Sequence, residues 1–190
     1  MPTSNCPTLQ DYIAGEQCKE NLAGVASAVY AFNKADLQAK LTANENLYST
    51  PSFKSDKGLY KIDCKEEANS IQGTSLGPNK GFRLTLAFTI DAVNQIASKI
   101  GRAVNNLDLG FIVVDGEDSQ ILYDPNRRVK FESDGIQSNT GAAAADDRTT
   151  VFNAQLGPVN YPNLYVSPPN DENGWDSLLA SAAESSNQGN

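Results

Sequence analysis

The segment that most constrains the fold is residues 82–90, where apolar and polar side chains alternate over nine positions. Successive side chains of a β-strand point to opposite faces, so the alternation predicts a strand with one buried face. The apolar positions on that face are Phe82, Leu84, Leu86, Phe88 and Ile90. Directly after this strand the apolar period changes from two to 3.6 residues, which indicates a helix. The fold must therefore supply a core that a sheet and a helix share.

One amphipathic helix is predicted from Asp91 to Val104. Its apolar positions lie at i, i+3, i+7 and i+11, and they are Val93, Ile96, Ile100 and Val104. Asp91 is the expected N-cap, because its carboxylate can accept hydrogen bonds from the free amides of the first turn. We expect all four apolar side chains to pack on the sheet, so that Ile96 is buried.

Short apolar or alternating segments predict seven further strands. They are expected at residues 24–32, 59–64, 107–114, 120–123, 128–131, 150–156 and 163–166. Two polar segments, 38–57 and 65–81, show no sustained period and are interpreted as long loops that become ordered only against neighbouring copies. The prediction is a mainly β fold, a β-sandwich or barrel with one flanking α-helix and long loops. We divide it into an N-terminal leader or arm at 1–20, a domain at 21–166 and an acidic C-terminal arm at 167–190.

The balance of charged side chains is acidic. The chain has 15 basic and 23 acidic residues, a formal net charge of −8, and residues 134–190 alone hold seven acids and one base. This balance argues against a groove that binds nucleic acid. The longest apolar runs are far shorter than the roughly 20 residues that span a bilayer, so no membrane partner is expected. The first residues carry no recognisable secretion signal, and a reducing cytosol is the expected place of synthesis.

Catalytic and metal-binding residues are not evident. The sequence contains no histidine, which removes the commonest general base and the commonest metal ligand. Cys6, Cys18 and Cys64 match neither zinc nor redox spacing and are interpreted as free or buried thiols. The acids within 115–124 lack the spacing of a calcium loop and are interpreted as a solvated turn. We therefore expect no enzyme activity, no cofactor and no metal.

A small basic and aromatic group lies at residues 123–131. Arg127, Arg128 and Lys130 are flanked there by Tyr123 and Phe131. Cations next to aromatic rings are also found in nucleic-acid grooves, but the whole chain is acidic. We interpret these cations as partners of salt bridges between subunits.

Four segments carry a resemblance to a known family. They are residues 24–32, the strand at 82–90 running into the helix at 91–104, residues 134–141, and the turn at 147–150 with the strand that follows it. In this order, over roughly residues 20–166, the chain resembles the tail-tube proteins of long-tailed bacteriophages. Those proteins are small β-sandwiches or barrels with one flanking helix and extended loops.

The resemblance implies a homo-oligomer. In that family, subunits form hexameric rings whose sheets join into a continuous β-barrel, and the rings stack into a tube through long loops and terminal arms. The implied partners are copies of the chain, other tail or head-completion proteins, and DNA that passes through an acidic lumen without specific binding, in a virion assembled in the host cytoplasm. The residues expected to make contacts between subunits are Asn44, Tyr48, Phe53, Lys65, Asn79, Lys80, Arg127 and Arg128.

Two other classes of protein remain open at this point. Another virion component, such as a capsid decoration protein or a head–tail connector, would have the same acidic, non-catalytic composition. A monomeric β-sandwich that binds a carbohydrate or another ligand would account for the strands, the tyrosines and Trp175. An enzyme would need a catalytic group that the sequence does not supply.

Overall fold

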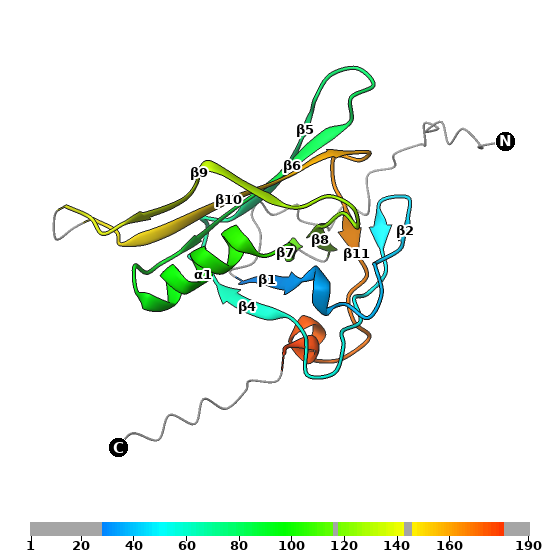
Figure 1. Ribbon diagram of the computed structural model, residues 1–190, viewed down its shortest axis with the longest axis horizontal. Coiled ribbons are helices and arrows are strands. Elements are labelled where there is room, and N and C mark those ends of the chain that lie inside the picture. The colour runs from blue at the N-terminus through cyan, green and yellow to red at the C-terminus, as the bar shows by residue number, and fades with distance from the viewer. Residues whose placement is uncertain (1–27, 116–117, 143–145, 181–190) are drawn as a thin grey trace, which may run out of the picture.

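The computed structural model describes residues 28–115, 118–142 and 146–180. These residues form two β-sheets and one α-helix, and the helix lies beside strands of both sheets (Figure 1). The prediction of a mainly β sandwich with one flanking helix is confirmed. The predicted leader at 1–20, which contains Cys6 and Cys18, lies outside the described residues. No helix in the described part of the chain is long and apolar enough to cross a membrane.

The larger sheet has seven strands in the order β2-β3-β11-β8-β7-β1-β4. Their bounds are β1 Ala28–Asn33, β2 Ala43–Asn44, β3 Leu47–Tyr48, β4 Tyr60–Asp63, β7 Leu109–Asp115, β8 Asp118–Leu122 and β11 Tyr165–Val166. The pairs at its centre, β1 with β7 and β7 with β8, are antiparallel. These three central strands overlap the segments 24–32, 107–114 and 120–123 that the sequence predicts, because each carries consecutive or alternating apolar residues.

The smaller sheet has four antiparallel strands in the order β5-β6-β10-β9. Their bounds are β5 Ser70–Ser75, β6 Phe82–Ile90, β9 Lys130–Asn139 and β10 Thr149–Val159. The alternating segment at 82–90 is therefore a central strand of this sheet. In Figure 1 the β5–β6 hairpin projects away from the rest of the described residues.

Strand β5 contradicts the prediction that residues 65–81 form a loop. Its one large apolar side chain, Ile71, is half-buried, so the segment shows no apolar alternation. Gly73 lies opposite Leu84, on the same face of the sheet, and the backbone of Pro162 lies directly against it. A Cβ at Gly73 would lie 1.8 Å from the carbonyl oxygen of Pro162. A polar edge strand that needs glycine at this position cannot be recognised from apolar periodicity.

Aromatic side chains join the two sheets in the core. Phe88 of β6 stacks on Phe152 of β10 with ring centroids 4.8 Å apart. On its other side Phe88 meets Phe111 of β7, in the larger sheet, at 6.0 Å. All three side chains are fully buried. The core face of β6 that the sequence predicts is thus the surface that holds the sandwich together.

Helix α1 spans Gln95–Asn106 and begins later than predicted. Its N-cap is Asn94, whose side-chain oxygen accepts a hydrogen bond from the amide of Ala97 at 2.8 Å, and the prediction of Asp91 as N-cap is wrong. Ala97 and Val104 are buried, whereas Ile96 is 67% exposed. The expectation that Ile96 packs on the core is therefore also wrong.

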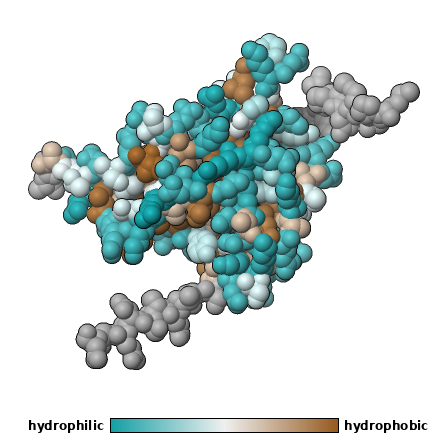
Figure 2. All heavy atoms as spheres, in the orientation of Figure 1, coloured by the Kyte–Doolittle hydropathy of each residue, from teal (hydrophilic) through white to brown (hydrophobic). Residues whose placement is uncertain are grey.

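The physical reason is the small side chains on the helix. A Cβ at Gly101 would lie 3.6 Å from Ile136 of β9 and 4.0 Å from Phe152 of β10, so the helix approaches the sheet closely along Ala97 and Gly101. This close approach turns the face that contains Ile96 to one side. In Figure 2 hydrophilic side chains cover most of the visible face, and apolar patches appear near its middle, around the place where α1 lies in Figure 1.

The polar segment 38–57 is ordered by contacts within the chain. It contains the short strands β2 and β3, and its residues Leu41 and Tyr48 are buried in the core. The Tyr123 hydroxyl accepts a hydrogen bond from the amide of Leu41 at 3.3 Å. The expectation that this segment becomes ordered only against neighbouring copies is therefore wrong.

The C-terminal part of the described chain also joins the core. A 3₁₀ helix at Gly174–Leu178 contains Trp175, which is buried and donates a hydrogen bond from Nε1 to the Oγ of Ser119 at 2.9 Å. Next to it the Tyr30 hydroxyl donates to Oδ1 of Asp176 at 2.8 Å. Residues beyond 166, predicted as a separate arm, thus pack on the larger sheet as far as they are described.

A pair of substitutions on α1 tests this orientation of the helix. Val104→Asp should lower the free energy of unfolding by about 3 kcal/mol or more, because it places an unpaired carboxylate in the core. Ile96→Asp should change that free energy by less than about 0.5 kcal/mol, because its side chain lies in water. Urea denaturation followed by circular dichroism measures both values, and the reverse order would show that the helix presents its other side to the sheet.

Candidate functional site

Among the described residues, the smaller sheet has two free edges, β5 and β9. Each of its three neighbouring pairs is antiparallel, so β5 and β9 run in opposite directions. Edge strands expose backbone amide and carbonyl groups that can pair with another chain. The two edges are therefore complementary in direction: the β9 of one molecule can extend the β5 edge of a second molecule as a further antiparallel strand.

The backbone groups that β5 offers can be assigned. The amide of Leu76 donates to the carbonyl oxygen of Gly81 at 2.9 Å and continues the register of the β5–β6 ladder. Hydrogen-bonded pairs alternate along antiparallel strands, so the even-numbered residues of β5 bond to β6. By the same alternation, Ile71, Gly73 and Ser75 direct their amides and carbonyls away from the sheet.

The face of the smaller sheet that points away from the core is polar and almost uncharged. It lies opposite the buried row of Leu84, Leu86 and Phe88 on β6. By the strand registers, its side chains are Ser70, Gln72, Thr74, Arg83, Thr85, Ala87, Thr89, Lys130, Gln137, Asn139, Thr149, Val151, Asn153 and Gln155. Amides and hydroxyls dominate these assigned positions, and the charged ones among them are the cations Arg83 and Lys130. Glu132 and Asp134 are exposed in the part of β9 where the register shifts and no partner is assigned.

Five of the eight predicted contact residues are exposed, and four of these five have no side-chain hydrogen bond or ion pair with the described residues. Asn79 and Lys80 lie at the tip of the β5–β6 hairpin, where Asn79 adopts a positive φ of 58°. Asn44 lies in β2, at one edge of the larger sheet. Arg127 lies in the connection between β8 and β9, and its guanidinium forms no hydrogen bond or ion pair with the described residues. These four side chains are free to contact another molecule.

The other four have partners within the chain. Phe53 packs edge-on against Phe32 with ring centroids 6.0 Å apart, and Lys65 forms an ion pair with Asp147. Arg128 donates through Nη2 to the carbonyl oxygens of Asn105 and Leu107, at 3.1 and 2.9 Å, at the C-terminal end of α1. Tyr48 is buried and packs edge-on against the ring of Tyr123.

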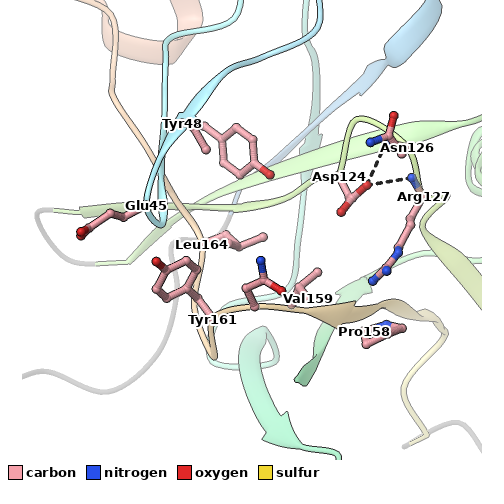
Figure 3. A pocket seen from close by; sticks show the side chains of 11 residues that line it. Glu45, Tyr48, Asp124, Asn126, Arg127, Pro158, Val159, Tyr161 and Leu164 are labelled. Carbon is pink, nitrogen blue, oxygen red and sulfur yellow. Dashed lines mark hydrogen bonds between the residues drawn. The ribbon is translucent and has the colours of Figure 1, made fainter. Parts of the chain in front are cut away.

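Tyr48 and Arg127 come together at a pocket of about 340 Å³. Figure 3 shows the Tyr48 hydroxyl and the Arg127 guanidinium pointing toward the same space, with the Asp124 carboxylate beside them. Glu45 and Tyr161 lie at another side of the pocket, farther from Arg127. The structure thus brings together two residues that lie almost 80 positions apart in the sequence.

Lys34 fixes the turn that carries Arg127. Its Nζ donates to the carbonyl oxygens of Asp124 and Arg127 at 3.0 and 2.5 Å and forms an ion pair with Asp108 at 2.9 Å. Within the turn, Oδ1 of Asp124 accepts from the amides of Asn126 and Arg127, both at 2.8 Å. The position of the arginine is therefore set by the backbone, although its guanidinium is free.

Sequence reasoning missed the β5 edge and most of the pocket. The edge has no apolar pattern, and the pocket walls come from three separate segments, residues 43–48, 124–127 and 158–164. The one local signal was the Asp124-Pro125-Asn126-Arg127 sequence, which is typical of a turn held by an aspartate side chain. Such a turn does not reveal what its side chains face.

Nucleophile and metal chemistry are not evident at any described position. Burial raises the pKa of the Cys64 thiol to about 12, so the thiolate does not form at neutral pH. Among the described residues, no three Cys, Asp or Glu side chains are placed to hold a metal ion. Candidate binding surfaces on the described residues include the β5 and β9 edges, the polar face between them and the pocket beside Tyr48.

The two neighbouring arginines give a matched test of this description. Arg128→Met should lower the free energy of unfolding by about 1 kcal/mol, because it removes two hydrogen bonds and a cation from the C-terminal end of α1. Arg127→Met should leave it within about 0.5 kcal/mol of the parent, because its guanidinium has no partner among the residues that the structure describes. Thermal and urea denaturation measure both, and equal losses would contradict the different roles of the two side chains.

Comparison with known proteins adds no assignment to this geometry. No protein-family model matches the chain, and no curated protein or solved structure matches it either.

Proposed function

We propose that this chain is a structural subunit that assembles with copies of itself into rings, and that the rings stack into a tube like the tail tube of a long-tailed bacteriophage. The observation that supports the proposal most is the smaller sheet, with two oppositely directed free edges and one open polar face. The segments that resemble the tail-tube family include the predicted strand at 82–90 and helix at 91–104, which correspond to β6 and α1.

Joining the sheets from copy to copy gives a closed ring. When β9 of one molecule pairs with β5 of the next, the same contact repeats around the assembly with a constant rotation. If this rotation closes the assembly into a ring, the smaller sheet has no exposed edge left. All edge-strand amides and carbonyls are then hydrogen-bonded, and no edge remains for open-ended aggregation. The number of subunits follows from that rotation, and six is the number that the resemblance implies.

The open face of the sheet would line the inside of the ring. Helix α1 and the larger sheet both lie on the opposite, core-facing side of the smaller sheet. When the smaller sheets join into a ring, there is more space for these elements outside the ring than inside it. At the positions assigned by the strand registers, the lumen would then carry amides and hydroxyls with Arg83 and Lys130, rather than the acidic lining that the resemblance implies. A wall with so few cations gives DNA phosphates few places to bind, which suits passage without specific binding.

Stacking between rings would use the hairpin tip that projects from the body. Asn79 and Lys80 lie exposed at this tip, and the turn is closed by the bond between Leu76 and Gly81. A preformed hairpin loses little conformational entropy when it meets a second ring. We infer that these two residues contribute axial contacts, with other tail or head-completion proteins meeting the same tips at the ends of the tube.

A matched pair of substitutions on β5 tests the ring proposal. Ile71→Pro removes an amide that points outward, so it should prevent pairing with a neighbouring β9 and yield a monomer of 20.4 kDa. Ile71→Val keeps that amide and should assemble like the parent. Size-exclusion chromatography with light scattering and negative-stain microscopy measure the outcome.

Circular dichroism and thermal melting serve as the control for folding, because proline at this position leaves the β5–β6 ladder intact. A parent chain that stays monomeric at high concentration would contradict the proposal. Rings from a folded Ile71→Pro variant would show that a different surface carries assembly.

A further inference from the structure

The pocket beside Tyr48 contains a hydroxyl group that has no hydrogen-bond partner among the described residues. Tyr48 is 8% exposed, and its ring is held against that of Tyr123 with centroids 5.4 Å apart. Its hydroxyl forms no hydrogen bond with any described residue and points into the pocket (Figure 3). The hydroxyl is therefore open to the pocket, and its hydrogen-bond partner comes from whatever occupies that space.

The hydroxyl remains a hydrogen-bond donor at any physiological pH. Burial, followed by the negative charge of Asp124, raises the pKa of Tyr48 to about 12. The phenol is therefore neutral, and it can both donate and accept a hydrogen bond. A ligand that contacts the Tyr48 hydroxyl must therefore offer a hydrogen-bond acceptor or donor.

Two opposite charges face the same space. The Asp124 carboxylate uses one oxygen for the amides of its own turn, and the Arg127 guanidinium has no partner among the described residues. The two groups point toward the space that the Tyr48 hydroxyl faces and form no ion pair with each other. A simple anion would meet the carboxylate, and a simple cation would meet the guanidinium, so a ligand without net charge suits both.

The remaining walls supply amide groups and apolar surface. The side chains of Asn126 and Asn160 line the pocket, and Nζ of Lys40 fixes Asn126 by donating to its Oδ1 at 3.1 Å. Pro158 and Tyr161 add flat apolar surface on another side. A volume of about 340 Å³ lies at the small end of the range for ligand pockets.

We propose that this pocket binds a neutral polyhydroxylated ligand, of the chemical class of a sugar residue. Vicinal hydroxyls of such a ligand donate to Asp124 and accept from Arg127 and Tyr48, while its C–H face packs against the apolar wall. Each sugar hydroxyl can donate and accept a hydrogen bond, so neighbouring hydroxyls can pair with a carboxylate, a guanidinium and the amide side chains of the pocket at the same time.

The proposal does not depend on ring assembly. No residue of β5 or β9 lines the pocket, so the site is complete within one chain. Binding should therefore persist in the monomeric Ile71→Pro variant. Loss of assembly with binding retained, or the reverse, tells the two proposals apart.

Binding is tested with a panel of neutral mono- and disaccharides, by saturation-transfer NMR and then by calorimetry on the full chain. At least one member should bind with a dissociation constant in roughly the millimolar range or tighter. Tyr48→Phe, which keeps the ring, and Arg127→Met should each weaken that binding by about tenfold or more. Arg102→Met, on an exposed part of α1, is the matched control and should bind like the parent.

Thermal melting separates a binding role of Tyr48 from a structural one. Because the hydroxyl has no protein partner, Tyr48→Phe should melt at the same temperature as the parent without ligand and lose the stabilisation that ligand gives. The proposal is overturned if no saccharide binds at roughly 10 mM, or if Tyr48→Phe binds as the parent does. It is also overturned if both pocket variants abolish self-association and no saccharide binds, since a second copy would then be the occupant.

Discussion

The architecture depends on one constraint: the smaller sheet commits a single face to the core. Phe88 and Phe152 stack on that face and meet Phe111 of the larger sheet, and this aromatic contact fixes the two sheets against each other. Helix α1 packs closely against the same sheet because Ala97 and Gly101 are small. The opposite face and both edges are left without partners in the described chain, and those are the surfaces on which assembly can be built.

The sequence predicted elements whose stability comes from local apolar pattern. Strand β6 and the presence of one helix after it follow from the change of period between residues 82 and 104, and β7 follows from its apolar run. Strand β5 could not be predicted, because an edge strand with one half-buried side chain shows no alternation. The prediction that Ile96 is buried was wrong because the helical period shows only which side of the helix is apolar. The small residues that face β9 and β10 decide which part of that apolar side packs on the sheet.

The candidate surfaces were harder to predict than the fold, because they depend on contacts distant in sequence. Arg127 and Arg128 are neighbours, yet one faces a pocket and the other bonds to the end of α1. Tyr48 belongs to a segment that looks like a polar loop, and its burial comes from Tyr123, far along the chain. Adjacent side chains thus acquire different roles from the elements that pack on either side of them.

The triple attachment of Lys34 has a consequence for chemical footprinting of this protein. Its ammonium group is bound by two carbonyl oxygens and one carboxylate, and its side chain is 11% exposed. An amine-acylating reagent should therefore modify Lys80 and Lys130, which are exposed, long before it reaches Lys34. Acylation of Lys34 would report that the turn at 124–127 has opened, so this lysine is a built-in reporter of local unfolding there.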